Sequence, residues 1–159
     1  MLVRPAREED LPGVCKLAAE LVRQHHRLDA DRFLIAEPLE SGYHWFLSQE
    51  LTRAGALILL AEDDAGALLG YAYATLEPRN WSDLLDACGK LNDIFVDEAA
   101  RRRGVARALV EAVREELARR GAPRVVLMTA WRNPEAHAFF EAMGFRRTML
   151  EMTAELPNS

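Results

Sequence analysis

Apolar residues are spaced with two different periods along the chain. In several short segments they alternate with polar residues or run continuously, a pattern that predicts β-strands. The run at residues 124–130 is almost wholly apolar, which favours a central position in a sheet. The expected strands cover residues 2–4, 56–63, 68–77, 90–96, 124–130 and 145–152.

Between these segments, apolar residues recur every three or four positions, which predicts amphipathic helices. Asp10, Ser41 and Asn133 stand where each could cap a helix N-terminus. Gly121 and Gly144 follow the last periodic residues of two helices and are typical stop signals. The expected helices run from Leu11 to a polar loop at residues 28–40, over residues 41–53, from Val105 to Arg120, and from Pro134 to Met143.

The resulting order is β-α-α-β-β-β-α-β-α-β, which predicts an α/β fold with a mixed central sheet of six to seven strands and about four helices. Residues 56–63 and 68–77 should form an antiparallel hairpin. A helix joins residues 90–96 to residues 124–130, so these two strands should be parallel. A chain of 159 residues without repeats or linkers fits a single domain over residues 1–159.

The composition is that of an ordinary soluble protein, with 50% hydrophobic and 28% charged residues. The first ten residues lack the order of a signal peptide, and no apolar run is long enough to span a bilayer. We therefore expect a cytoplasmic protein that does not contact membranes. The two cysteines and four histidines show no metal-ligand spacing, so no metal site is expected.

The charge is unevenly distributed along the chain. Residues 29–98 hold 14 acidic and 4 basic residues, whereas residues 101–132 hold 3 acidic and 9 basic ones. Either this is an ordinary solvated surface, or one region meets a cationic partner and the other an anionic one. The net charge of −5 argues against general nucleic-acid binding.

Three arginines and a glycine, in the stretch RRRGVA at residues 101–106, stand at the expected start of a helix. A helix N-terminus has unpaired N–H groups and favours anions, so the stretch is a candidate phosphate site. The alternative is a basic loop in which glycine serves only the turn. No Gly-Lys-Ser/Thr follows, and there is only one glycine, so neither a Walker A loop nor a dinucleotide fingerprint is present.

These residues resemble the Q/R-x-x-G-x-G/A signature of the GNAT superfamily of N-acetyltransferases. Residues 133–145, NPEAHAFFEAMGF, are similar to the family's second signature, N-x-x-A-x-x-(apolar)-Y-x-x-x-G-F. The resemblance extends over essentially the whole chain and implies a GNAT fold. It also implies an enzyme that binds acetyl-CoA and transfers the acetyl group to an amine by direct attack in a ternary complex.

The resemblance assigns the acetyl-CoA contacts residue by residue. Backbone amides of the first signature would bind the pyrophosphate, and the preceding strand would hold the pantetheine arm along an edge that a bulge splays from the next strand. Thr129 and Ala130 would line the other side of this split. The implied binding residues are Ile94, Phe95, Val96, Arg101, Arg102, Arg103, Gly104, Val105, Ala106, Asn133, Ala136 and Phe140.

One catalytic group of the family is missing. The tyrosine that protonates the leaving thiolate in many members is Phe140 here. Water could supply the proton, Tyr71 or Tyr73 could substitute, or the protein could bind acyl-CoA without catalysis. Asp93 is the first candidate for deprotonating or holding the amine, although it could also be a structural carboxylate, and Glu77 is the second.

The acceptor is less well defined. The acidic region favours a small cationic amine, with Tyr43, Trp45, Phe46 and Trp81 available to pack on it, although Tyr43 and Phe46 are more easily explained by packing within the fold. A protein N-terminus or lysine is the alternative acceptor. The closing segment at residues 145–152 and the habits of the family favour a homodimer.

Overall fold

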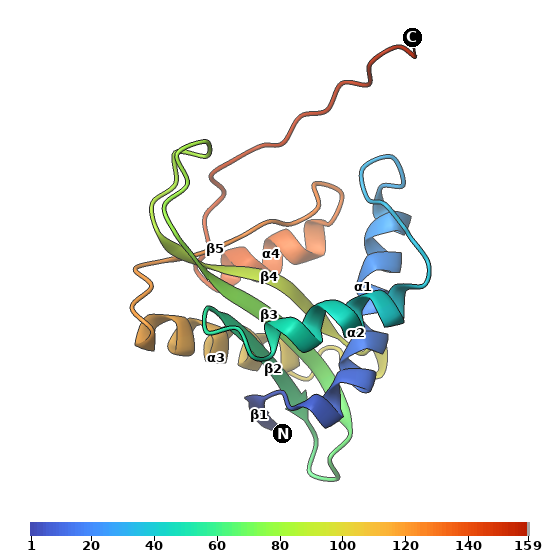
Figure 1. The fold of residues 1–159 in the computed structure, drawn as a ribbon, viewed down its shortest axis with the longest axis vertical. Helices are drawn as coiled ribbons and strands as arrows, with labels where there is room; N and C mark the ends of the chain where they lie inside the picture. The colour runs from blue at the N-terminus through green and yellow to red at the C-terminus, as the bar shows by residue number, and fades with distance from the viewer. Residues whose placement is uncertain (159) are drawn as a thin grey trace.

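Residues 1–158, described by a computed structural model, form one five-stranded sheet with helices on both of its faces (Figure 1). The strands are β1 Leu2–Pro5, β2 Ala56–Glu62, β3 Leu68–Glu77, β4 Cys88–Val96 and β5 Val125–Leu127. The helices are α1 Leu11–Leu28, α2 Leu39–Glu50, α3 Val105–Arg119 and α4 Pro134–Ala142, with short 3-10 turns at Glu8–Asp10 and Glu98–Ala100. None of the helices in this part of the chain is both long and apolar enough to cross a membrane.

The sheet has the order β1-β2-β3-β4-β5, so neighbours in sequence are neighbours in space. The predicted hairpin of β2 and β3 is confirmed as antiparallel, and β4 and β5 are parallel, as the intervening α3 requires. The predicted central position of β5 is wrong. It is a three-residue edge strand whose side chains are only half-buried.

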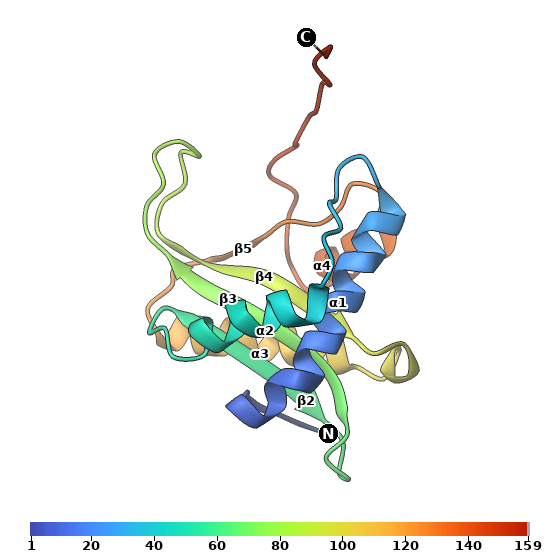
Figure 2. The ribbon, with the colours of Figure 1, turned by 45° about the vertical axis from the view of Figure 1, so that its right-hand side comes forward.

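The predicted closing strand at residues 145–152 is also wrong, which reduces the six to seven expected strands to five. The chain beyond α4 runs away from the body of the molecule (Figures 1 and 2). Glu151 accepts hydrogen bonds from the guanidinium of Arg32 at 2.8 and 3.0 Å. Met149 and Met152 stay 83% and 90% exposed, because no apolar surface of the described chain lies against them.

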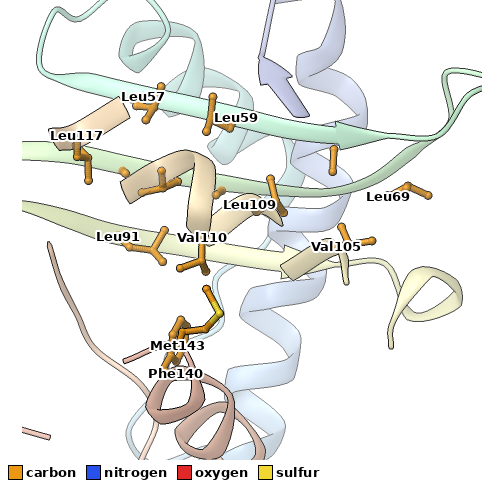
Figure 3. Packing of buried hydrophobic residues seen from close by; sticks show 14 of the residues in the cluster. Leu57, Leu59, Leu69, Leu91, Val105, Leu109, Val110, Leu117, Phe140 and Met143 are labelled. Carbon is orange, nitrogen blue, oxygen red and sulfur yellow. The ribbon is translucent and has the colours of Figure 1, made fainter. Parts of the chain in front are cut away.

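Two hydrophobic clusters hold the helices on the sheet, because alternate strand residues point to opposite faces. On one face, Leu109 and Val110 of α3 pack in one cluster with strand residues, with Phe140 of α4 and with Met143, the residue after α4 (Figure 3). On the other face, the apolar sides of α1 and α2 cover a cluster that includes Tyr71, Tyr73 and Phe95. The sheet is therefore the middle layer of a three-layer fold.

The helix starts agree with the predictions to different degrees. Asn133 caps α4 as expected, accepting a hydrogen bond from the N–H of Ala136 at 3.2 Å. The helix α2 begins two residues earlier than predicted, so Ser41 lies inside its first turn and is not its cap. Asp10 precedes α1 but does not cap it, because its carboxylate instead binds the guanidinium of Arg4 at 2.7 and 3.0 Å.

Candidate active site

The strands β4 and β5 separate after a short paired stretch. The two strands pair only over Gly89–Leu91 and Val125–Leu127. At this point β4 contains a β-bulge: Tyr73 of β3 faces Asp93, while the next residue, Ala74, faces Leu91, so Asn92 is the extra residue. A bulge bends and twists its strand. The edge of β4 beyond the bulge therefore has backbone groups with no neighbouring strand.

The split between β4 and β5 forms part of a cavity of about 800 Å³, bounded by α1, α2, β4, the start of α3, the segment after β5, and α4. The structure brings most of the predicted site residues together around it. Those that line the cavity are Asp93, Ile94, Phe95, Val96, Arg101, Arg102, Gly104, Val105, Ala106, Asn133, Ala136 and Phe140. Thr129 and Ala130 line the opposite side of the split, whereas Arg103 and Glu77 are not among the lining residues.

The start of α3 presents backbone to the cavity. Gly104 is the N-cap residue with φ +80°, and no side chain caps the first turn. The first N–H groups of a helix have no carbonyl partner within that helix, so those of residues 105–107 are free to bind an anion. A Cβ atom on Gly104 would meet no protein atom within 4 Å, so open space lies in front of this backbone.

The side chain of Arg101 is held at the end of β4. Its guanidinium carbon lies 5.6 Å from the centre of the Phe95 ring, and its Nε donates to the carbonyl oxygen of Val96 at 3.4 Å. Arg102 adopts φ +63°, a left-handed conformation that only a minority of non-glycine residues adopt. The turn therefore places two arginines at the same end of the cavity as the helix N-terminus.

Asp93 lies at the other end, on the face of β4 that α1 and α2 cover. Its Oδ2 accepts a hydrogen bond from the hydroxyl of Tyr71 at 3.1 Å. Burial raises the pKa of this carboxyl group, an effect that the hydrogen bond from Tyr71 and the charge of His25 oppose. Keeping this carboxylate ionised without a positive partner therefore costs free energy. Because Asp93 lines a cavity large enough for a ligand, it is a candidate binding group for a cation.

His25 was not predicted to be a site residue, and Tyr43 was assigned mainly to packing within the fold. Both line this end of the cavity. Burial, together with the charge of Asp93, raises the pKa of Tyr43 above its usual range. Helical spacing from Leu21 and Val22, which also line the cavity, was the available signal for His25.

Glu77 is linked to the cavity only indirectly. Its carboxylate accepts a hydrogen bond from the hydroxyl of Thr75 at 2.6 Å, and that hydroxyl accepts one from the side-chain amide of Asn92 at 2.9 Å. Asn92 is the bulged residue and lines the cavity. The chain of hydrogen bonds indicates that Glu77 supports the bulge.

Phe140 stands where many members of the family have the proton-donating tyrosine, and Tyr71 and Tyr73 are the residues that could substitute for it. Phe140 is buried against Phe139 and Phe145, with ring centres 5.0 and 5.6 Å apart, and it also lines the cavity. Tyr71 donates to Asp93 and Tyr73 donates to Glu50, and neither is among the lining residues. Over the described residues, the hydroxyl groups that line the cavity are those of Tyr43 and Thr129.

Six of the fourteen acidic residues in the negatively charged region form ion pairs. Asp29 pairs with Arg132 at 3.5 Å and Asp86 with Arg79 at 2.9 Å. Within residues 1–158, the acidic side chains that line the cavity are Asp93 and Glu135. The charge of the acceptor end therefore depends on Asp93 more than on the regional excess of acids.

The sequence has recognisable relatives. Residues 19–145 match the acetyltransferase (GNAT) family. Glucosamine 6-phosphate N-acetyltransferase 1 of rice (Oryza sativa subsp. japonica) is 33% identical over 106 residues, which cover 65% of this chain and 62% of the rice protein. The match thus spans less than two thirds of that relative. The uncharacterized N-acetyltransferase YhfO of Bacillus subtilis (strain 168) is 27% identical over 91% of this chain and 89% of its own length.

Solved structures share the same fold. A mutant of the protein BH1408 from Bacillus halodurans superposes with a TM-score of 0.83 at 21% identity, covering 99% of this chain and 100% of its own. The aminoglycoside 6′-N-acetyltransferase AAC(6′)-IG from Acinetobacter haemolyticus has a TM-score of 0.75 at 22% identity, with both chains covered in full. At this level of identity, the likeness establishes a common fold only. The substrate has to be inferred from the residues that line the cavity.

Proposed function

Because the chain belongs to the acetyltransferase (GNAT) family, we propose that it is an N-acetyltransferase that moves the acetyl group of acetyl-CoA to a primary amine of a small molecule. One observation carries the proposal. A single cavity has an uncapped helix N-terminus with two arginines at one end and a half-buried carboxylate at the other. Anionic phosphates and a cationic amine fit these two ends.

Acetyl-CoA metabolism is intracellular, so we also propose a cytoplasmic location.

The fit of this chain to acetyl-CoA comes from its backbone. The N–H groups of residues 105–107 would bind the pyrophosphate, and Arg101 and Arg102 would add positive charge beside it. The open edge of β4 at residues 94–96 would pair with the amides of the pantetheine arm as a neighbouring strand does. The co-substrate itself supplies an acetyl group already activated as a thioester.

The acceptor end fits an ammonium group and an apolar body. Asp93 supplies the negative charge, while Leu21, Phe33 and Tyr43 supply apolar and aromatic surface. Of the described α1 and α2 residues that line the cavity, none is lysine or arginine. An amine that carries its own phosphate, such as the substrate named for the rice relative, would find no partner there. We therefore propose a small cationic amine without phosphate.

The lining residues support direct transfer in a ternary complex. Both ends belong to the same cavity, so the amine and the thioester can be bound together. Among the described lining residues there is no serine or cysteine that could carry the acetyl group covalently. The chain's role is then to hold the amine, remove its proton and place it against the carbonyl carbon.

We propose that the thiolate leaves without a protein acid, since a thiol with a pKa of about 8.5 is a moderate leaving group. Phe140→Tyr restores the hydroxyl that the family signature carries at this position. We expect kcat to change by less than about threefold, because a thiolate of this kind needs little help from an acid to leave. A tenfold rise would require about 1.4 kcal/mol of additional transition-state stabilisation. A tenfold or larger rise in kcat would show that protonation limits the natural enzyme.

The phenylalanine also motivates a second candidate function, a non-catalytic acyl-CoA sensor. The two functions differ in one measurement, the release of free thiol from acetyl-CoA in the presence of amines. A sensor would bind acetyl-CoA at micromolar concentrations and release no thiol with any amine, whereas an acetyltransferase would release it with at least one. We favour the enzyme because a sensor has no need for a half-buried carboxylate that lines the cavity.

We also propose that the chain forms a homodimer through residues 146–152. Leu150 and Met152 are exposed on a segment with strand-like alternation, and the outer edge of β5 has no neighbouring strand within residues 1–158. An unpaired edge is a template for a strand of another chain. Deletion of residues 146–159 should convert a dimer into a monomer in sedimentation analysis, with Phe145 and the core retained. A full-length chain that sediments as a monomer at tens of micromolar would contradict this proposal.

A further inference from the structure

His25 is oriented for proton transfer by its own helix. It lies half-buried in the last turn of α1, and its Nδ1 is 2.8 Å from the carbonyl oxygen of Leu21. A carbonyl oxygen can only accept, so Nδ1 carries the proton in the neutral ring. The lone pair is then on Nε2, for which the described residues supply no hydrogen-bond partner. The ring is thus held in the tautomer of a proton acceptor.

The ring of His25 lies near a helix C-terminus, a carboxyl group and two aromatic side chains. It lies at the C-terminal end of α1, where the helix dipole stabilises a positive charge. The charge of His25 also acts on Asp93, lowering the pKa of that carboxyl group. Tyr43 of α2 lines the same end of the cavity, and Phe33 of the following loop contacts the ring edge-on at 4.9 Å. The surroundings of His25 therefore include the carboxylate of Asp93, the hydroxyl-bearing Tyr43 and the C-terminal end of α1.

We propose that His25 is the general base that takes the proton from the acceptor amine, while Asp93 holds the amine as its counter-charge; this inference rests on the proposed acetyltransferase function. The division of roles follows from the geometry. One oxygen of Asp93 is occupied by Tyr71 at 3.1 Å, which fixes the carboxylate as a binding group. Nε2 of His25 has no such partner among the described residues, and His25 lines the same cavity.

The step balances as a single acyl transfer. A proton of the bound ammonium passes to Nε2 of His25, and the nitrogen lone pair then forms the N–C bond to the acetyl carbon. The C–S bond breaks, and its electron pair leaves with sulfur as the thiolate of coenzyme A. Loss of the second nitrogen proton to solvent gives the neutral amide, and the proton on His25 also passes to solvent. No oxidant or reductant is needed.

His25→Asn tests the role of Nε2 while keeping the fold. The asparagine amide can take the place of Nδ1 and donate to Leu21, but it has no counterpart of Nε2. His26→Asn is the matched control. His26 is the next residue, its Nδ1 is likewise 2.8 Å from a carbonyl oxygen, that of Phe33, and it does not line the cavity. Melting temperature and affinity for coenzyme A are measured for both variants, to exclude a loss of folding.

We expect kcat of His25→Asn to fall about 100-fold, the lower end of what a general base contributes. The Kd for coenzyme A should be unchanged, and His26→Asn should stay within about twofold of the natural protein. Added imidazole should restore part of the activity of His25→Ala in proportion to its neutral form. The acidic limb of the kcat–pH profile should disappear in both His25 variants.

The proposal is overturned if His25→Asn keeps more than a third of the natural kcat. It is also overturned if turnover is lost but the pH profile keeps its acidic limb and imidazole restores nothing, because the ring then acts only through packing. Failure of the underlying function gives a different result: the natural protein itself releases no thiol with any amine.

Discussion

Replacing Gly104 with leucine is expected to lower the affinity for coenzyme A by at least about 100-fold, because two effects coincide. A β-carbon at φ +80° costs about 1–2 kcal/mol, which opposes the turn that presents the backbone of α3. The new side chain would also occupy the open space in front of Gly104, where the pyrophosphate must approach the N–H groups. The measurement is the Kd of coenzyme A by calorimetry.

Gly121→Leu is the matched control for the strain. Gly121 ends the same helix, has φ +91°, and also faces open space, but it does not line the cavity. We expect it to lower stability similarly while leaving the Kd near its natural value. Alanine at Arg101, Arg102 or Arg103 should each weaken binding by no more than about fivefold, as exposed ion pairs contribute 0.2–1 kcal/mol. Equal losses in Gly104→Leu and Gly121→Leu would mean that the start of α3 is not the phosphate site.

Replacing Asp93 with asparagine is the second large effect that we expect. Removing the charged partner of a buried ammonium costs about 3–5 kcal/mol, so kcat/KM for the amine should fall about 100-fold or more. The Kd of coenzyme A should not change, because Asp93 lies at the opposite end of the cavity from α3. If Asp93 holds the amine, the loss appears in KM; if it were the base itself, the loss would appear in kcat. Full activity in this variant would remove Asp93 from the site.

The same substitution should stabilise the protein. Because burial raises the pKa of Asp93, the folded chain binds this proton more tightly than the unfolded chain does. The free energy of unfolding therefore decreases as pH rises from the ordinary aspartate range through the raised pKa, and asparagine removes this loss. At pH 7–8 the variant should melt a few degrees higher, at about 2–4 °C per kcal/mol. A lower melting temperature would show that the carboxylate supports the fold.

The parts of the site that depend on local spacing were predictable. The cap at Asn133, the glycine at the start of α3 and the parallel pairing of β4 and β5 all follow from residues within one β-α-β unit. The bulge at Asn92 was expected only through the resemblance to a known family, because one extra residue leaves almost no trace in the alternation of a strand.

The parts that depend on distant partners were not predictable. The apolar alternation of residues 145–152 is typical of a strand, but a strand also needs an edge to pair with, and this chain does not supply one. The acidic excess of residues 29–98 indicated a cationic ligand, yet ion pairs such as Asp86 with Arg79 neutralise much of it. The role of His25 depends on which loop and strand lie beside the end of α1, and its spacing alone does not reveal them.

The most direct test of the account is the release of free thiol from acetyl-CoA, followed across a panel of small amines with the natural protein and Asp93→Asn. The panel should contain polyamines, aminoglycosides, simple aralkylamines and glucosamine 6-phosphate. We predict amine-dependent thiol release with at least one cationic amine, little with the phosphorylated sugar, and a loss of about 100-fold or more in kcat/KM in the variant. Tight binding of acetyl-CoA with no amine-dependent release would contradict the account and favour a sensor.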